Sequence, residues 1–353
     1  MIDELEKIIF DLISFETQNQ NLLEINKCIL YIKNYFNGTD YICEVNESNG
    51  VQSLFIHKKD CGKLDCIFSG HIDVVPADDS QFKPFIKDNK IFGRGAIDMK
   101  SQVGTIIYFI KHYQGNKKIG ALITSDEEIG GFNGTPKALS KFKINANVAI
   151  VPDGGYNFQL VNSERGVLQL EINVTGLSVH SSKEPEGINA IVRAVELYSA
   201  IKDHLNIETA NCQTVNLASL STDNNVYNKV PDKAKMLIDI RYNKQCNINY
   251  VYELLDNCNY VEYSIYAKAN PFYCDTTNII IKKYIDVCQK VLQREIEVIE
   301  FSAAADARYF TDMQIPTIIM NPNGQEMHGK NEAIEIESIG TLLNIYENFV
   351  KEL

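Results

Sequence analysis

Short hydrophobic runs alternate with longer amphipathic stretches in the first and last parts of the chain. The runs of strand length cover residues 64–68, 119–124, 148–151 and 317–320. Hydrophobic residues recur every three or four positions in residues 3–15, 22–36, 100–113, 279–292 and 337–353. Uninterrupted short runs predict buried strands, and the wider spacing predicts helices that bury one face. Strands that alternate with helices predict an α/β fold with an open sheet covered by helices.

A central segment has a different pattern, in which hydrophobic and polar residues alternate one by one. Residues 166–175 show this alternation, which predicts a half-exposed strand. Further elements are predicted nearby, namely a strand at 235–241 and helices at 188–201 and 247–256. We therefore expect a smaller α+β domain over residues 164–272. It is inserted into a larger domain formed by residues 1–163 and 273–353.

The chain carries an excess of acidic residues. Its 353 residues contain 46 Asp and Glu against 34 Lys and Arg, which gives a formal net charge of −12. Nucleic-acid binding needs a basic surface, so this balance argues against a nucleic-acid partner. No apolar run reaches membrane-spanning length, and residues 1–6 lack the basic start of a signal peptide. We expect a cytoplasmic protein without a membrane partner.

A histidine and an aspartate follow the first apolar run. His71 and Asp73 are two positions apart, so in an extended strand their side chains point the same way. A metal-bound imidazole usually donates its other ring N–H to a carboxylate, which fixes its tautomer and orientation. The pair therefore supplies a metal ligand and its orienting group. A single His-x-Asp is more often a turn or a surface hydrogen bond, so the pair needs support from the rest of the chain.

That support comes from further acidic residues and a second histidine on predicted loops, most of them just after strands. These residues are Asp98, Glu127, Glu128, Asp153 and His328. In open α/β sheets, ligands bind beyond the carboxyl ends of the strands, so we expect these loops to converge. Two simpler interpretations stay open. Asp98 could cap the helix at 100–113, and the acidic run at 126–128 could be a solvated loop.

Two histidines and several carboxylates in one cleft fit zinc. They exceed the four ligands that a single structural ion needs, which argues against a single-metal structural protein. One shared carboxylate, two terminal carboxylates and two histidines instead fit two ions about 3.5–4 Å apart.

The motifs together resemble the co-catalytic zinc aminoacylase and carboxypeptidase family. That family includes acetylornithine deacetylase, succinyl-diaminopimelate desuccinylase, carboxypeptidase G and dipeptidases. The matching stretches, in the family's order, are 69–73, 93–100, 125–130, 152–153, 176–180, 228–231, 239–241, 306–308 and 328–332. The resemblance implies a mixed, mostly parallel sheet sandwiched by helices as the catalytic domain. It also implies that the inserted α+β domain forms a homodimer interface and a lid.

The resemblance also implies a ligand set for two zinc ions, with cobalt or manganese as substitutes. Asp98 would bridge both ions. His71 and Asp153 would hold one ion, and Glu128 and His328 would hold the other.

Catalytic and substrate-binding roles are implied in the same way. Asp73 would orient His71, and Glu127 would act as the general base. His180 would reach the partner's active site and stabilise the developing oxyanion. The residues that would line the substrate cleft are Arg165, Asn228, Arg241 and Arg308. For each arginine, a surface or interdomain salt bridge is the alternative.

We therefore expect a metal-dependent hydrolase that cleaves an amide bond of an N-acyl-amino acid or a short peptide, a small-molecule substrate. An alternative is a biosynthetic deacylase, either a succinyl-diaminopimelate desuccinylase or an acetylornithine deacetylase. Asp153, where the desuccinylase typically has Glu, and the peptidase-like stretch 127–131 favour the first choice. A non-catalytic metal-binding relative is an alternative of another class. Glu127 argues against it, because a binding module needs no base beside its ligands.

Overall fold

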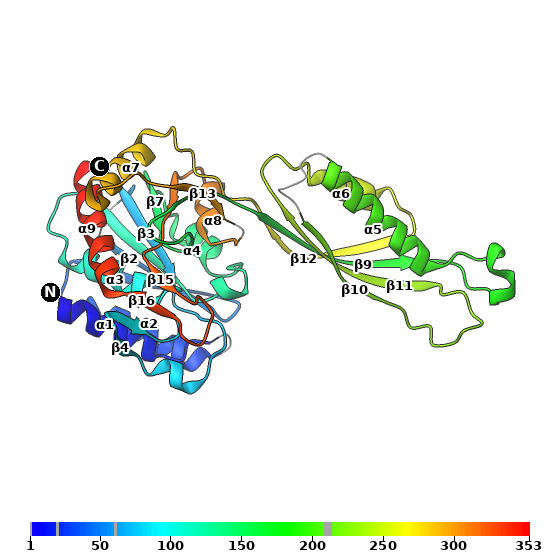
Figure 1. Ribbon diagram of the computed structural model, residues 1–353, viewed down its shortest axis with the longest axis horizontal. Coiled ribbons are helices and arrows are strands. Elements are labelled where there is room, and N and C mark those ends of the chain that lie inside the picture. The colour runs from blue at the N-terminus through cyan, green and yellow to red at the C-terminus, as the bar shows by residue number, and fades with distance from the viewer. Residues whose placement is uncertain (1, 19–20, 60–61, 208–213, 302) are drawn as a thin grey trace. The chain divides into compact units, whose positions relative to one another are not determined.

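The structure is a computed structural model that describes residues 2–18, 21–59, 62–207, 214–301 and 303–353. The chain divides into two compact units. Met1–Asn162 and Tyr273–Leu353 form the large unit, and Ser163–Phe272 form the small unit. Figure 1 labels the helices and strands of both units.

A mixed β-sheet forms the core of the large unit. Its strands are β1 (Tyr41–Ser48), β2 (Val51–Lys58), β3 (Cys66–His71), β6 (Ile119–Thr124), β7 (Ala149–Val151), β8 (Leu160–Glu164), β13 (Val298–Phe301) and β14 (Thr317–Ile319). Among the described residues their order is β1-β2-β6-β3-β7-β14-β8-β13. The central strands β6, β3, β7 and β14 run parallel to one another. Strand β1 pairs antiparallel with β2, and β2 pairs antiparallel with β6. The predicted α/β fold with a mixed, mostly parallel sheet is confirmed, with the parallel strands at its centre.

Helices cover this sheet. They are α1 (Ile2–Ser14), α2 (Leu22–Tyr35), α3 (Lys100–His112), α4 (Thr135–Phe142), α7 (Ile279–Leu292), α8 (Ala307–Asp312) and α9 (Ile336–Glu352). The five predicted helices of the large unit form within one residue of their expected bounds. Figure 1 shows α3 and α9 on one side of the sheet and α4 and α8 on the other. None of the described helices is long and apolar enough to cross a membrane.

Helix α3 is buried because it packs against β3, β6, α1 and α9. All of its residues from Lys100 to Ile110 are buried. Gly104 faces α1, and a Cβ at that position would lie 2.9 Å from Ile9 Cγ1. The absence of a side chain there lets the two helices approach closely.

A second, smaller sheet of the large unit was not predicted from the sequence. Its strands are β4 (Phe85–Lys87), β5 (Lys90–Phe92), β15 (Gly324–Gln325) and β16 (Ala333–Glu335), and they pair antiparallel in the order β15-β16-β5-β4. The pairing of β16 with β5 joins segments that are about 240 residues apart in sequence. It thereby brings the loop before α3 next to the loop that carries His328.

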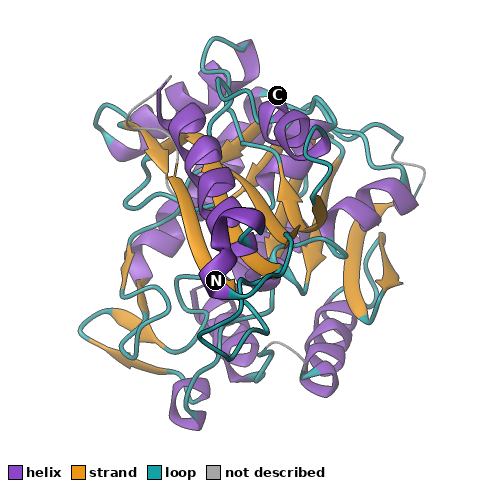
Figure 2. Cartoon of the chain, turned by 90° about the vertical axis from the view of Figure 1, so that its right-hand side faces the viewer, coloured by secondary structure: helices purple, strands orange, loops and turns teal. Residues whose placement is uncertain are grey.

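The small unit is an antiparallel sheet with two helices. Its elements are β9 (Gly166–Thr175), β10 (Thr214–Ser221), β11 (Lys233–Tyr242), β12 (Val261–Ala269), α5 (Ala190–Ile207) and α6 (Asn249–Asp256). The strand order is β10-β11-β9-β12. Alternate residues of β9, such as Leu168 and Leu170, are buried with Ala194 and Leu197 of α5. The predicted α+β unit is therefore present, and Figure 2 colours the helices and strands of the whole chain.

Candidate metal centre

Three parallel strands of the large unit bring acidic and histidine side chains to one edge of the sheet. His71 is the last residue of β3, and Asp153 lies two residues beyond β7. Glu127 and Glu128 open the short 3₁₀-helix η2 (Glu127–Ile129) that follows β6. Because His71 pairs with Thr124 at the end of β6, η2 starts beside the imidazole. Parallel neighbours end at the same edge, so these side chains converge.

Asp98 lies at the centre of the site, and each of its carboxylate oxygens contacts a different imidazole. Oδ1 lies 3.1 Å from His71 Nε2, and Oδ2 lies 2.9 Å from His328 Nε2. The N-cap of α3 is Met99, which makes no side-chain cap hydrogen bond. The capping interpretation of Asp98 is therefore wrong. A carboxylate with one oxygen toward each of two histidines is suited to be a shared ligand.

The other candidate ligands form two groups around this carboxylate. On one side, Glu127 Oε2 and Asp153 Oδ2 lie 3.9 and 3.8 Å from His71 Nε2. On the other side, Glu128 Oε1 lies 3.2 Å from His328 Nε2. The two groups that could each hold an ion are His71, Glu127 and Asp153, and Asp98, Glu128 and His328. The side chains of Glu127 and Glu128 are 13% and 8% exposed, so the solvated-loop interpretation is wrong.

Asp73 contacts His71 through both its backbone and its side chain. The Asp73 carbonyl oxygen lies 2.9 Å from His71 Nδ1, and its carboxylate oxygen Oδ1 lies 3.5 Å from the same nitrogen. A carbonyl oxygen can only accept, so Nδ1 carries the proton and Nε2 stays free as a ligand. The other Asp73 carboxylate oxygen accepts the Glu128 backbone N–H at 3.0 Å. One aspartate thus connects a ligand on β3 with a ligand on η2.

The site concentrates negative charge in a buried place. Burial and the neighbouring Asp153 raise the pKa of Glu127 well above its usual range. Burial and Asp98 raise the pKa of Asp153 to about 7. Burial also acts to raise the pKa of Asp98, but hydrogen bonds from His328 and His71 outweigh it and hold that pKa below its usual range. Hydrogen bonds to carboxylates, first of all to Asp98, raise the pKa of His328 to about 10.

The residues present fit divalent metal ions. The carboxylates gathered here are Asp73, Asp98, Glu127, Glu128 and Asp153, and they face the two imidazoles of His71 and His328. Buried carboxylates in excess of their cationic partners are unfavourable unless further positive charge compensates them. Imidazole nitrogen and carboxylate oxygen are ligands that zinc and related ions accept. The donor set therefore suits ions that add this missing charge.

Arg308 supports the loop that carries Glu127. It is 3% exposed, and its Nη2 donates to the Gly130 carbonyl at 2.7 Å. Its guanidinium also lies 4.8 Å from the ring centroid of Tyr309, whose hydroxyl donates to the same carbonyl at 2.9 Å. Arg308 thus contacts a carbonyl and a phenol of the large unit. A substrate role for Arg308 stays a prediction, and it would have to be shared with this loop contact.

His180 and Asn228 lie next to each other in the small unit. The Asn228 carbonyl accepts the Ser181 N–H at 3.0 Å, and His180 forms a β-bridge with Lys229. His180 is exposed, and its Nδ1 accepts the Ser182 N–H at 3.2 Å. Because a backbone N–H can only donate, Nδ1 is an acceptor, and the neutral ring carries its proton on Nε2. The imidazole therefore offers a donor on Nε2.

The two other predicted substrate residues also belong to the small unit. Arg241 donates from Nε and Nη2 to the two oxygens of Asp239, at 2.8 and 3.1 Å. This ion pair agrees with the alternative that Arg241 forms a salt bridge. Arg165 directly precedes β9 and is half-buried. By contrast, all five candidate metal ligands belong to the large unit, as does the candidate base.

Two buried aspartates near the site had no role in the sequence interpretation. Asp126 accepts the backbone N–H groups of Asn133 and Gly134 at 2.9 and 3.0 Å, which closes the loop that begins with η2. Asp306 accepts the Thr135 hydroxyl at 2.5 Å, at the start of α4. Burial and the neighbouring Asp306 raise the pKa of Asp126 to about 7. The only sequence signal for either residue was its position inside a motif.

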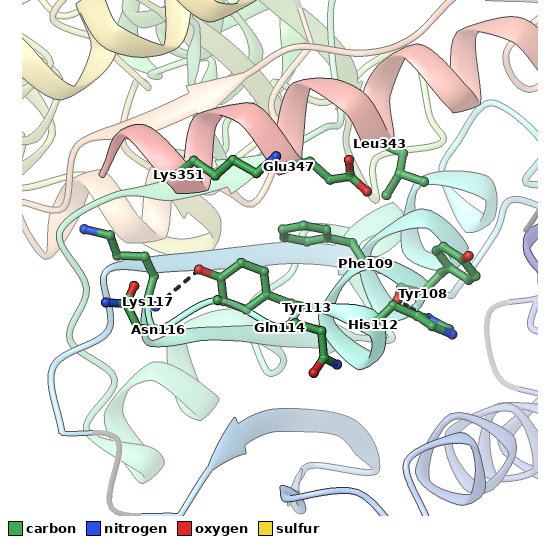
Figure 3. Close-up of a pocket in the computed structure, with 11 residues that line it drawn as sticks. Tyr108, Phe109, His112, Tyr113, Gln114, Asn116, Lys117, Leu343, Glu347 and Lys351 are labelled. Atoms are coloured by element: carbon green, nitrogen blue, oxygen red, sulfur yellow. Dashed lines mark hydrogen bonds between the residues drawn. The ribbon is translucent and has the colours of Figure 1, made fainter.

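A cavity of about 440 Å³ lies elsewhere in the large unit. Its lining comes from the end of α3, the turn after it and α9, and includes Tyr108, Phe109, His112, Tyr113, Leu343, Glu347 and Lys351. Figure 3 shows the aromatic side chains below α9, with the Tyr113 hydroxyl accepting the Lys117 N–H. Asp98 precedes the other end of α3, and a 13-residue helix is about 20 Å long. The cavity is therefore separate from the metal groups.

The fold and the paired carboxylate–imidazole groups define a metal-dependent hydrolase, and the comparisons with known proteins agree. Residues 67–352 match the model of peptidase family M20/M25/M40, and the chain belongs to this family. The succinyl-diaminopimelate desuccinylase of Sulfurovum sp. is 25% identical over 344 residues, which cover 92% of each chain. That of Wolbachia pipientis is 27% identical over 370 residues, covering 96% of this chain and 91% of the relative.

Solved structures share the fold. A tripeptidase from Staphylococcus aureus aligns with a TM-score of 0.78 and 18% identity, covering 100% of this chain and 98% of its own. An M20 family metallo-carboxypeptidase from Sulfolobus solfataricus aligns with a TM-score of 0.77 and 19% identity, covering 99% of each chain. The family expected from the sequence motifs is confirmed, and so is the reaction class of a hydrolase.

Proposed function

We propose that the chain hydrolyses an amide bond of an N-acyl-amino acid or a short peptide with the help of two zinc ions. His71 and Asp153 would hold one ion, Glu128 and His328 the other, and Asp98 would bridge them. Cobalt or manganese would serve as substitutes. The observation that carries the proposal is the placement of Asp98, with its two oxygens 3.1 and 2.9 Å from two different imidazoles.

Glu127 and Asp73 would have separate roles in the proton transfers of the reaction. When bound, the two ions lower the pKa of a bound water and polarise the substrate carbonyl. Glu127 takes a proton from the attacking water and later gives it to the leaving amine. Its raised pKa, caused by burial and Asp153, suits a carboxylate that must hold a proton between these two transfers. Asp73 keeps His71 in the tautomer that leaves Nε2 free.

A homodimer would complete the site. His180 belongs to the small unit, far along the chain from every metal ligand. We infer that it acts in the partner's site and donates its Nε2–H to the developing oxyanion. The Ser182 N–H on Nδ1 supports this role, because it keeps the proton on the opposite nitrogen. Arg165, Asn228, Arg241 and Arg308 are proposed to line the substrate cleft.

A second candidate substrate is an N-succinyl amine. The observation that favours it is the name of the relatives, since both desuccinylases align over more than 90% of this chain. Asp153 and the stretch 127–131 favour the peptide or N-acyl-amino acid instead. Both substrates carry an amide and a carboxylate, so the same water attack serves either.

A hydrolysis panel separates these substrates. The purified protein, loaded with zinc or cobalt, would be assayed with N-acetyl-amino acids, N-succinyl-diaminopimelate and dipeptides, and the released amine measured. We expect turnover of an N-acyl-amino acid or dipeptide. Preference for the N-succinyl substrate would establish the second candidate. Binding of metal without hydrolysis of any amide would support a non-catalytic relative.

Metal removal is expected to lower stability as well as activity. Ligand that binds only the folded state adds about 2.7 kcal/mol of stability at 100 times its Kd, and here it also neutralises clustered carboxylates. Dialysis against a chelator should therefore lower the melting temperature in scanning calorimetry, and zinc should restore it. Asp98→Ala is the control and should respond weakly to either treatment. Identical melting with and without metal would contradict the two-ion site.

A further inference from the structure

A buried ion pair joins the two loops that carry Asp98 and His328. Arg94 and Glu332 are 3% and 1% exposed, and Arg94 Nη1 donates to Glu332 Oε2 at 2.5 Å. The two residues are 238 positions apart in sequence. The family motifs contain both, but neither had a role in the interpretation of the sequence or in the proposed reaction.

Each member of this pair also holds the backbone of a candidate metal ligand. The free oxygen of Glu332, Oε1, accepts the N–H groups of Ile97 and Asp98 at 3.1 and 3.2 Å. The second terminal nitrogen of Arg94 donates to the His328 carbonyl at 3.0 Å. The network then closes on itself, because the Asp98 carboxylate lies 2.9 Å from His328 Nε2.

His328 needs such support more than the two ligands that lie at strand ends. His71 ends a fully buried strand, and Asp153 follows another strand of the same sheet, so the sheet itself places them. His328 lies in a turn with φ of 62°, a left-handed conformation, and its side chain is 46% exposed. Contacts from neighbouring loops must therefore set where its imidazole points.

We propose that Arg94 and Glu332 are positioning residues that set the affinity of the ion held by Glu128 and His328. This inference rests on the two-ion proposal. The pair contacts the backbone of two ligands of that ion, Asp98 and His328. Of the ligands of the other ion, it contacts only Asp98, which both ions share. Loss of the pair should therefore weaken the two ions unequally.

Substitutions that keep the charge separate positioning from electrostatics. Arg94→Lys retains the positive charge, but one ammonium group cannot replace the planar fork that reaches both Glu332 and the His328 carbonyl. Glu332→Asp retains the negative charge and shortens the side chain by one methylene, so its carboxylate cannot reach Arg94 and the Asp98 N–H together. Because the charge is unchanged in either variant, a change in metal affinity reflects the altered position of the ligand loops.

The test is calorimetric titration of the metal-free protein with cobalt ions alone, with cobalt absorption as a second signal. Wild-type protein should take up two equivalents. In Arg94→Lys and Glu332→Asp, one equivalent should bind at least about 10-fold more weakly, as for other residues behind metal ligands, while the other changes by less than about 3-fold. Activity should return when cobalt is raised to saturate the weakened site.

Ile345→Ala is the matched control, because Ile345 is fully buried in α9 and its apolar side chain has no group that could take part in this hydrogen-bond network. It should lower the melting temperature and leave both equivalents unchanged. The inference would be overturned if Arg94→Lys and Glu332→Asp weakened both equivalents equally or left both unchanged. It would also be overturned if Ile345→Ala caused the same unequal loss. Uptake of a single equivalent by wild-type protein would overturn the two-ion proposal, and with it the claim of unequal loss.

Discussion

Glu127→Gln is expected to lower turnover by at least about 100-fold while both ions stay bound, since this is the usual contribution of a general acid–base group. Glutamine keeps the size and shape of the side chain but cannot take the proton of the attacking water. The Glu127 carboxylate lies 3.9 Å from His71 Nε2, in a buried site that raises its pKa. Steady-state kinetics and metal analysis of the same preparation would measure both effects.

The neighbouring residue supplies the control. Glu128→Gln should lose metal along with activity, because Glu128 lies 3.2 Å from His328 Nε2 and is a proposed ligand. The geometry makes this comparison necessary, because Glu127 is itself within ligand reach of His71 and Asp153. If Glu127→Gln loses metal and Glu128→Gln keeps it, the two roles are exchanged.

His180→Ala is expected to cost about 10²–10³-fold in turnover, the effect of losing an oxyanion donor, with both ions retained. His180 offers its Nε2–H because the Ser182 N–H occupies Nδ1. Ser182→Ala is the matched control. It removes the hydroxyl 2.8 Å from Nδ1 but keeps the backbone donor, so the tautomer and most of the activity should survive.

Mixing two inactive variants tests whether His180 acts across a dimer. A heterodimer of His180→Ala and Glu127→Gln has one site with both defects and one site with neither. Random exchange makes half of the dimers heterodimers, so about a quarter of wild-type activity should return. Labelled subunits would establish that exchange has taken place. A mixture that exchanges and stays inactive means that His180 serves its own subunit or has no catalytic role.

The sequence by itself determined the elements whose signal is local. Apolar runs define β3, β6, β7 and β14, because a strand buried on both faces needs hydrophobic residues without interruption. Hydrophobic residues three to four positions apart define α1, α3, α7 and α9, because a helix that buries one face needs that spacing. The sequence also placed the candidate ligands after these strands, since the carboxyl edge of a parallel sheet is where such residues meet.

Elements that depend on distant partners were missed. The strands of the second sheet, β4, β5, β15 and β16, are two or three residues long. They are too short to show the alternation of hydrophobic and polar residues that predicts a strand. Strands β10 and β12 of the small unit, with residues exposed along much of their length, were also not recognised. Their pairing with neighbours decides their conformation, and a single-segment pattern does not contain that information.

The tertiary structure alone decided how the site is held. No local pattern around Asp98 indicates that its two oxygens face His71 and His328, 27 and 230 residues away, and only the family resemblance implied a shared ligand there. The contact between Arg94 and Glu332 is equally non-local. The contacts of Asp98 with His328 and of Arg94 with Glu332 arise because β5 and β16 pair and bring two remote loops together. Buried polar groups must then find partners among the groups that surround them. The residue types and their order were encoded locally, whereas their mutual geometry was set by the packing of the whole large unit.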